Sequence, residues 1–428
     1  MKKYRPRIAD QVLKDNLESS GLVLIEGTKW CGKTTTAERQ SGSVIYLNDP
    51  SHRSTYMQLA QTSPSILLEG KTPRLVDEWQ DAATLWDTAR FEIDHRDNGA
   101  GQFIFTGSTV VKKEERDKIR HSGAGRASWM KMRPMSLFES GESDGSVSLG
   151  DLFLGEIREA RAVQGIDIKE LAYLICRGGW PASVDMAETA ALRQAYNYID
   201  AIVNSDISQV DDVERDEVFT RRLLRSYARA QGTQATISTI YTDLVVNDDK
   251  TLKEDTISSY LNALRKLFVV EDSLAWNPNL RSKTAIRTSD TRYFVDPSIA
   301  TAALGLGPND LIVDMNTMGL MFETLCVRDL RVYAEALNGD VYHYRDKSGL
   351  ECDAVIHLRN GAYGLVEIKI GGEKLIEEGI RSLQKLSDRI DTDKMKTPAF
   401  MMVLTGVGEY AYRDKSGVLV VPITALRP

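Results

Sequence analysis

The sequence predicts an α/β fold of several domains, with a parallel sheet near the N-terminus and a second α/β domain near the C-terminus. Between residues 21 and 137, short apolar runs alternate with polar, helix-like stretches, which is typical of buried parallel strands joined by helices. The middle of the chain has a helical pattern, and strand-like runs return after residue 340. A chain of 428 residues is long enough for about two to four domains, each with its own core.

The composition limits the classes of partner. Hydrophobic residues make up 42% and charged residues 27% of the chain, and the formal net charge is −7. Such a charge gives no overall attraction to nucleic acid or to an anionic membrane, so DNA binding requires a local basic patch. No apolar run approaches the roughly 18–20 residues of a membrane-spanning helix, and the basic N-terminus lacks the apolar core of a signal peptide. We therefore expect a cytoplasmic protein without a membrane partner.

The cysteine pattern also favours the cytoplasm. They are scattered along the chain and show no paired spacing of metal ligands; they are Cys31, Cys176, Cys326 and Cys352. We expect four reduced thiols.

The first candidate site is a phosphate-binding loop. The segment GTKWCGKTT at 27–35 follows the apolar run LVLIE at 22–26 and has the pattern of a glycine, four free positions and Gly-Lys-Ser/Thr. Backbone N–H groups of such a loop surround the β-phosphate of a nucleotide. We expect Lys33 to reach the β and γ oxygens and the Thr34 hydroxyl to hold Mg²⁺. The expected nucleotide-binding residues of the loop are Gly27, Thr28, Lys29, Trp30, Cys31, Gly32, Lys33, Thr34 and Thr35.

Two later strand ends supply the groups that hydrolysis needs. RLVDEWQ at 74–80 is an apolar run ending in two acids; Asp77 is expected beside the metal, and Glu78 is expected to polarise the attacking water. FIFTGST at 103–109 ends in hydroxyls, and Thr106 or Ser108 is expected to sense the γ-phosphate. Within the loop, Trp30 has two open interpretations, packing against protein or stacking on adenine.

These motifs resemble those of the bacterial and archaeal AAA-type ATPases whose C-terminal half is a domain of unknown function. The resemblance rests on GTKWCGKTTT, RLVDEWQ, FIFTGST and HSGAGRASWMKMRPMSLFESGE. It implies ATP hydrolysis by a P-loop NTPase domain, joined to a winged helix and a restriction-endonuclease-like fold. It also places Arg126 at a γ-phosphate or subunit contact, although a purely structural arginine fits the residues equally well.

The middle of the chain predicts a linker, helices and a winged helix. ESGESDGSVSLG at 139–150 is rich in Gly and Ser and predicts an exposed linker. Two helix candidates and a hairpin pattern between 217 and 300 are typical of a winged helix-turn-helix. Its second helix exposes a mixed rather than basic set, so DNA contact and partner binding both stay open. That set is Lys253, Glu254, Asp255, Ser258, Ser259, Asn262, Arg265 and Lys266, and the expected wing adds Arg281, Lys283 and Arg287.

A second candidate site lies in the C-terminal domain. Glu367 and Lys369 in LVEIKI are two residues apart, so they share one face of a strand. With Asp353 in LECDAVI, they match the Asp–Glu-x-Lys pattern that the resemblance assigns to Mg²⁺ binding and to a lysine that positions water. The resemblance adds Glu323 from the preceding helix as a metal ligand, and Glu351 as a supplement. An active nuclease, a DNA-binding remnant and a structural domain all remain open.

Together these expectations define a working organisation. We expect a P-loop ATPase domain over 1–140, a helical lid segment over 141–215, a winged helix over 216–314 and a restriction-endonuclease-like domain over 315–428. The expected function is Mg²⁺-dependent ATP hydrolysis by a protein that acts on or senses DNA. The alternative is a nucleotide-switched regulatory ATPase whose C-terminal domain binds a protein partner or a second copy without cutting DNA.

Overall fold

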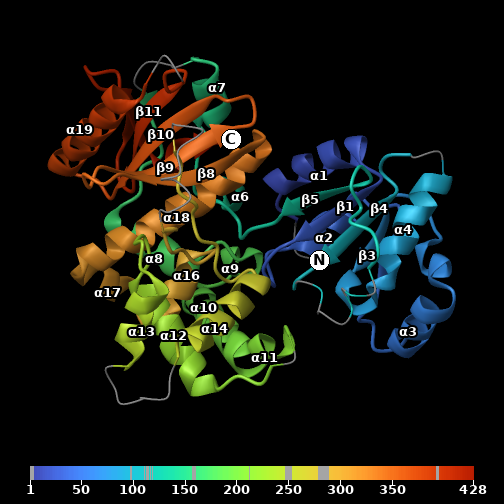
Figure 1. Cartoon of the computed structure of the whole chain (residues 1–428). Coiled ribbons are helices and arrows are strands. Elements are labelled where there is room, and N and C mark those ends of the chain that lie inside the picture. Colours follow the sequence, from blue (N-terminus) through green and yellow to red (C-terminus); the bar gives the residue numbers. More distant parts are fainter. Residues whose placement is uncertain are drawn as a thin grey trace. The chain divides into compact units, whose positions relative to one another are not determined.

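The computed structural model describes residues 4–428 except 97–98, 110, 112–114, 116, 118, 157–160, 212, 246–252, 278–288 and 392–394. Its chain divides into two compact units (Figure 1). Unit 1 contains Met1–Pro134, Ser205–Arg215 and Asn262–Val269, and unit 2 contains Met135–Asn204, Asp216–Leu261 and Val270–Pro428. In the described part of the chain, no helix is both long and apolar enough to cross a membrane.

Unit 1 is built on the expected parallel sheet. Its five strands have the order β2-β3-β4-β1-β5, and all neighbouring pairs are parallel. The apolar runs expected to form strands do so. The strands are β1 (Leu22–Glu26), β2 (Ser43–Tyr46), β3 (Arg74–Asp77), β4 (Phe103–Gly107) and β5 (Ala127–Lys131).

Helices cover both faces of this sheet because its strands are apolar on both sides. Leu24 and Phe105 face one core cluster, which includes Trp79 and Trp86. Val23, Ile25 and Ile104 face the other, which includes Leu13 of the first helix. The helices are α1 (Ile8–Ser19), α2 (Lys33–Glu38), α3 (Arg53–Thr62), α4 (Thr84–His95) and the short α11 (Ile207–Gln209).

Unit 2 begins with a helical layer. Its helices are α6 (Leu137–Ser140), α7 (Leu149–Phe153), α8 (Ile168–Arg177), α9 (Pro181–Val184), α10 (Glu188–Ala201), α12 (Glu217–Arg229), α13 (Ile237–Val245), α16 (Pro297–Leu304) and α17 (Pro308–Val313). Helix α7 is short, and Gly155, which has a φ of 77°, follows its end. Residues Arg161–Ala162 form strand β7.

The expected pair of helices followed by a ribbon is present where the chain is described. Helix α14 (Glu254–Lys266) follows α13, and antiparallel bridges then join Val270 to Phe294 and Ser273 to Thr291. The apolar side of α14 is buried through Ile257, Tyr260, Leu261, Leu264 and Leu267, as its spacing predicts. The expected wing residues Arg281, Lys283 and Arg287 lie outside the described residues. Assignment as a winged helix stays a prediction.

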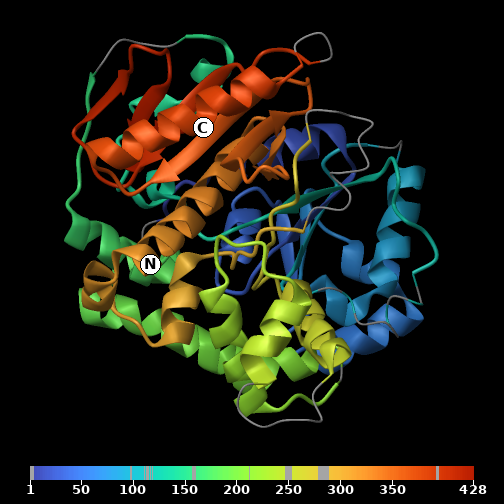
Figure 2. The ribbon, with the colours of Figure 1, turned by 60° about the vertical axis from the view of Figure 1, so that its left-hand side comes forward.

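The C-terminal part of unit 2 is a mixed seven-stranded sheet of order β7-β12-β13-β11-β10-β9-β8. Its remaining elements are α18 (Met315–Ala336), β8 (Gly339–Arg345), β9 (Glu351–Leu358), β10 (Tyr363–Lys369), α19 (Glu373–Arg389), β11 (Phe400–Thr405), β12 (Tyr410–Arg413) and β13 (Leu419–Pro422). Helix α19 lies along β10 and β11 in both views (Figure 1 and Figure 2) and packs Leu383 and Leu386 on Leu365 and Val403. Helix α18 contacts β8, β9 and β10.

The segment 139–150 is not the exposed linker that its composition predicts. Strand β6 (Val147–Ser148) pairs in parallel with β14 (Leu426–Arg427) at the end of the chain. The Ser143 hydroxyl donates to the carbonyl of Leu426 at 2.8 Å, and the Ser148 hydroxyl donates to that of Pro428 at 3.0 Å. Serine hydroxyls hydrogen-bond to backbone groups as readily as to water. Composition alone therefore could not distinguish an exposed linker from a segment bonded to the rest of the protein.

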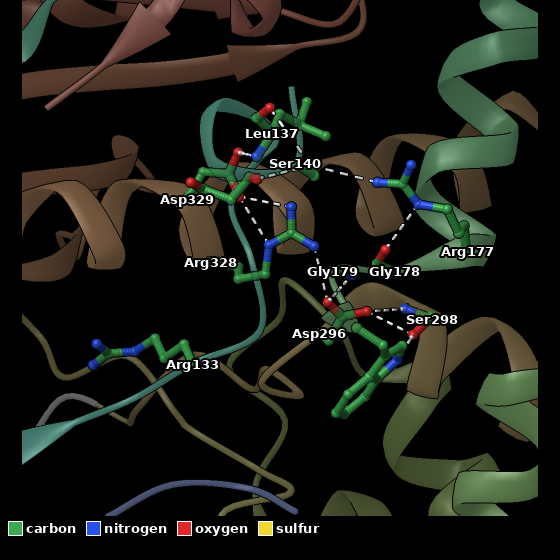
Figure 3. A network of polar contacts seen from close by, with 12 residues as sticks. Arg133, Leu137, Ser140, Arg177, Gly178, Gly179, Asp296, Ser298, Arg328 and Asp329 are labelled. Carbon is green, nitrogen blue, oxygen red and sulfur yellow. Dashed lines mark hydrogen bonds and ion pairs between the residues drawn. The ribbon is translucent and has the colours of Figure 1, made fainter. Parts of the chain in front are cut away.

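A buried charge network joins the parts of unit 2 (Figure 3). Arg328 of α18 is 2% exposed and contacts Asp296 at 2.8 Å and Asp329 at 2.7 Å. Asp296 also caps α16 through the backbone N–H of Ser298, and accepts from the N–H of Gly179 at 2.9 Å. Asp329 accepts from the N–H of Leu137 at 2.9 Å. Burial raises the pKa of Asp329 to about 6, although Arg328 opposes this shift.

Removal of the Arg328 guanidinium should therefore destabilise unit 2 strongly. In Arg328→Met, two carboxylates with no exposure lose their cation, and breaking a buried pair in this way costs about 3–5 kcal/mol. Urea unfolding followed by circular dichroism measures the loss. The matched control is Arg345→Met, which removes an ion pair to Glu351 that is 45% and 48% exposed and should cost less than about 1 kcal/mol. Equal losses in both variants would contradict the prediction.

Candidate nucleotide site and C-terminal acidic cluster

The phosphate loop depends on backbone conformations and space that few residues allow. Gly27 has a φ of 155°, and a Cβ at this position would lie 2.0 Å from the carbonyl oxygen of Met132. Gly32 has a φ of 103° and immediately precedes α2. Geometry therefore requires both glycines. A side chain at Gly27 would collide with the backbone of Met132, just after β5, and a side chain at Gly32 would be forced into a left-handed conformation. Trp30 also has a positive φ, of 66°.

The loop lysine and the adjacent threonine lie at the carboxyl edge of the sheet. The Lys33 ammonium donates to the carbonyls of Gly27 and Thr28, both at 2.8 Å. The Thr34 hydroxyl donates to Oδ1 of Asp77 at 2.7 Å, and the Thr106 hydroxyl donates to the same oxygen at 2.6 Å. Parallel pairing of β3 with β4 brings Asp77 opposite Thr106. Three segments far apart in sequence thus meet at one carboxylate.

The donor set at this point suits a hard divalent cation. Thr34 and Asp77 offer oxygen atoms 2.7 Å apart, and Mg²⁺ prefers one or two protein oxygens together with phosphate and water. Burial raises the pKa of Asp77, while the hydrogen bonds from Thr106 and Thr34 oppose that shift. A cation beside a buried carboxylate favours its ionised form. The residues therefore fit the expected Mg²⁺ site.

Glu78 follows in a conformation that is uncommon for a residue with a side chain. Its φ of 55° and ψ of 47° lie in the left-handed region, which costs about 1–3 kcal/mol and often occurs at functional sites. Oε2 of Glu78 accepts from the Ser108 hydroxyl at 3.0 Å and also from the side-chain amide of Gln80. Sequence reasoning did not single out Gln80, although it lies in the same RLVDEWQ motif.

The remaining loop residues differ in exposure. Cys31 is fully buried, and its thiol lies 3.4 Å from the carbonyl oxygen of Met132, which agrees with a small packing residue. The Trp30 side chain is 52% exposed, so stacking on a base and contact with another surface both stay open. Thr28 is buried and Thr35 is exposed. All four cysteines are free thiols, as expected.

Arg126 does not lie at the phosphate loop of its own chain. Its carbonyl accepts from the N–H of Leu22 at 3.0 Å, so it flanks the start of β1, whereas the loop follows the end of that strand. A five-residue strand separates the two by about 13 Å. The Arg126 guanidinium pairs instead with Asp94 at 2.7 Å. The expected contact with a γ-phosphate in the same chain is wrong, and a contact between subunits stays a prediction.

In the C-terminal domain, the expected lysine and two of the acids are in contact. The Lys369 ammonium lies 2.7 Å from Oε2 of Glu367 and 3.3 Å from Oδ2 of Asp353. The backbone N–H of Ile368 donates to Asp353 at 2.7 Å, and the Ser382 hydroxyl of α19 donates to Glu367 at 3.1 Å. Burial lowers the pKa of Lys369, but the two carboxylates more than offset this, so the net direction is upward.

Glu323 extends this cluster from helix α18. Its carboxylate accepts a hydrogen bond from the hydroxyl of Tyr293, a buried residue that sequence reasoning missed. A Cβ on Gly232 would lie 3.0 Å from Oε2 of Glu323, so only a glycine leaves room for this carboxylate. Burial, and then the charge of Asp353, raises the pKa of Glu323 well above its usual range. No sequence pattern links Tyr293 and Gly232 to an acid on a later helix.

The cluster does not fit a resident metal ion in this arrangement. Among the described residues, no group of three His, Cys, Asp or Glu side chains is arranged to hold one. Lys369 takes the position between two of the carboxylates. Glu351, expected as a supplement, pairs with Arg345 at 2.7 Å instead. We therefore derive no chemical step through a metal here.

Family models match three parts of the chain. An AAA domain matches residues 19–140, a domain of unknown function (DUF8612) matches 168–310, and a second (DUF4143) matches 318–426. Residues 19–140 of the chain are thus an AAA domain. The AAA domain covers the phosphate loop, Asp77, Glu78 and Thr106, so the candidate nucleotide site lies within it. ATP binding is consistent with this domain.

Several solved structures also resemble this chain. The Walker-type ATPase PABY2304 of Pyrococcus abyssi is 13% identical, with a TM-score of 0.40, over 70% of this chain and 99% of that chain. A RuvB variant of Thermotoga maritima is 14% identical, with a TM-score of 0.22, over 62% and 86%. The Hef helicase domain of Pyrococcus furiosus is 12% identical, with a TM-score of 0.19, over 99% and 95%. No curated protein sequence matches.

Helix α14 of this ATPase presents little free positive charge. Its first turn exposes Glu254 and Asp255, which repel phosphates. Of its basic residues, Arg265 donates to Asn262 at 3.1 Å and Lys266 pairs with Asp211 at 3.2 Å. DNA phosphates are usually bound by several lysines and arginines on one face, so DNA contact and partner binding at this helix both stay predictions.

The acidic cluster predicts a pH-dependent stability of the C-terminal domain. Burial, and then the charge of Asp353, raises the pKa of Glu367 from 4.5 to about 8. Between these values the folded state holds a proton that the unfolded state has lost, so stability falls as pH rises through the window. We expect thermal unfolding to show a fall of more than about 1 kcal/mol, and a flatter profile in Glu367→Gln.

The control for this prediction is Glu377→Gln, which removes a carboxylate that is 58% exposed on α19, the helix that packs on β10. Its profile should follow that of the unmodified chain. A Glu367→Gln profile parallel to both would show that this carboxyl group ionises normally in the folded state, and the prediction would be wrong.

Proposed function

We propose that this chain hydrolyses ATP with Mg²⁺ at the phosphate loop of unit 1. The observation that carries the proposal is the Asp77 carboxylate, whose Oδ1 accepts from Thr34 at 2.7 Å and from Thr106 at 2.6 Å. This oxygen links the expected metal ligand on α2 with the expected γ-phosphate sensor on β4. The AAA domain matched over residues 19–140 supports nucleotide binding at this edge.

Each polar group has a separate task in the proposal. The loop N–H groups bind the β-phosphate, and Lys33 moves from the loop carbonyls to the phosphate oxygens. Thr34, with Asp77 beside it, would hold a Mg²⁺ ion, which would supply positive charge next to the phosphates. Glu78 accepts a proton from the attacking water. Ser108 and Gln80 support this task because they fix the Glu78 carboxylate.

Two variants separate binding from hydrolysis. Lys33→Ala should lose both, because the loop then lacks the cation that meets the phosphates. Glu78→Gln should keep nucleotide binding but lower the hydrolysis rate about 10²–10⁴-fold, the usual effect of losing a general base. Phosphate release and binding of a fluorescent ATP analogue measure the two steps. Full hydrolysis in Glu78→Gln would exclude this residue as the base, and normal turnover in Lys33→Ala would contradict the proposal as a whole.

A second candidate function, cleavage of a phosphodiester in DNA, is favoured by the contacts of Lys369 with Asp353 and Glu367. These three residues are the set that the family resemblance assigns to nuclease chemistry. In this proposal Lys369 positions the attacking water, and unit 1 supplies ATP-dependent control. The acidic first turn of α14 favours the alternative, a nucleotide-switched regulator that binds a protein.

Incubation with single-stranded, duplex and branched DNA tests this second function. Asp353→Ala should abolish cleavage while ATP hydrolysis continues, because the cluster and the phosphate loop belong to different units. The readouts are product gels and phosphate release. Unmodified chain that cuts none of these substrates, and whose ATP turnover is insensitive to DNA, would contradict the DNA function and favour the regulator.

A further inference from the structure

The phosphate loop carries a second lysine whose partner lies far along the chain. Nζ of Lys29 donates to Oδ1 of Asp206 at 2.7 Å. Both residues belong to unit 1, because Ser205–Arg215 packs with the N-terminal segment. The matched AAA domain ends at residue 140. A carboxylate from outside that domain therefore contacts the loop that is proposed to bind phosphate.

The two partners differ in freedom. The Asp206 side chain is 10% exposed, whereas that of Lys29 is 39% exposed. A lysine ammonium on a flexible four-carbon stem can change partner easily. The Asp206 carboxylate has a shorter side chain and is nearly buried, so it has less freedom to follow the ammonium. When the ammonium leaves, a nearly buried carboxylate loses its cation, which is unfavourable.

Asp206 also lies at the end of an uncommon type of helical turn. It ends a π-helical turn over Ile202–Asp206, and such turns are frequent at functional sites. The residues that follow are joined to one another. The Arg215 guanidinium donates to the carbonyl of Ile207 and to Asp211, both at 2.6 Å, and Ile207 and Val210 are buried. A segment linked in this way responds as one body when a contact at its end changes.

We propose that Asp206 is part of the nucleotide site and senses its occupancy through Lys29. This inference rests on the proposed ATP function of the loop. A bound triphosphate carries more negative charge than one carboxylate and lies at the loop that holds Lys29, so it competes for the ammonium. Nucleotide binding and the Lys29–Asp206 contact then weaken each other, because coupling between two sites is reciprocal. ATP loosens Ser205–Arg215 within unit 1, and nucleotide release restores its contact.

The first test is ATP affinity. Asp206→Asn keeps the shape of the side chain and removes its charge, so the competing partner is lost and the Kd for ATP should fall at least about fivefold. In a Lys29→Met background the same change should have no effect. Asp200→Asn is the control, since it removes an ion pair to Arg221 in unit 2 that is 54% and 47% exposed, and its Kd should match that of the unmodified chain.

The second test measures the unmodified chain directly and uses Asp206→Asn as a comparison. Amide hydrogen exchange of Ser205–Arg215 in the unmodified chain should increase when a non-hydrolysable ATP analogue binds, and in Asp206→Asn it should be high from the start. The sensor is overturned if Asp206→Asn binds ATP no more tightly, or if exchange of the segment is the same with and without bound analogue. In that event the ATPase proposal stands. An unmodified chain that binds no nucleotide overturns both.

Discussion

The packing of unit 2 depends on the ion pairs of the buried Arg328 guanidinium. It lies between two carboxylates that have no exposure, Asp296 and Asp329, and each carboxylate also accepts a backbone N–H from a distant segment. Glycine is needed beside it, since a Cβ on Gly179 would lie 2.1 Å from the carbonyl oxygen of Met135. Helical layer and C-terminal sheet are thus joined by charge and close backbone approach as well as by apolar packing.

In the first unit the corresponding constraint is strand register. Parallel pairing brings the ends of β1, β3 and β4 to the same edge, and the polar residues that follow the apolar runs therefore converge. Asp77 lies opposite Thr106 because of this register, and Thr34 reaches the same carboxylate from the first turn of α2, which follows β1 through the loop. The same register moves Arg126 to the opposite edge, beside the start of β1. The direction of the parallel strands therefore explains both why polar residues gather near Asp77 and why Arg126 lies away from the phosphate loop.

Much of unit 1 could be predicted from sequence because its signals are local. Apolar runs give the strands, and the loop pattern gives the positions of Lys33 and Thr34. In unit 2, the position of Glu367 and Lys369 on one face of a strand could also be predicted from their spacing. The partners of Asp206 and Glu323 were not, because Lys29 and Tyr293 are distant in sequence and no periodicity relates them. The Ser-rich stretch at 139–150 misled for a related reason, since its hydroxyls bond to the end of the chain.

The division of the chain into two units limits where it can be truncated and which segments can be exchanged between relatives. Unit 1 is assembled from three separate stretches, the last two of which are short. A fragment that ends at residue 134 keeps every loop residue and every strand of the parallel sheet, yet lacks the stretch that bears Asp206, Ile207 and Val210. An exchange of N-terminal domains between relatives would likewise need matching residues near 205–215. The nucleotide-binding half is therefore not a contiguous module, and the two halves are expected to be inherited together.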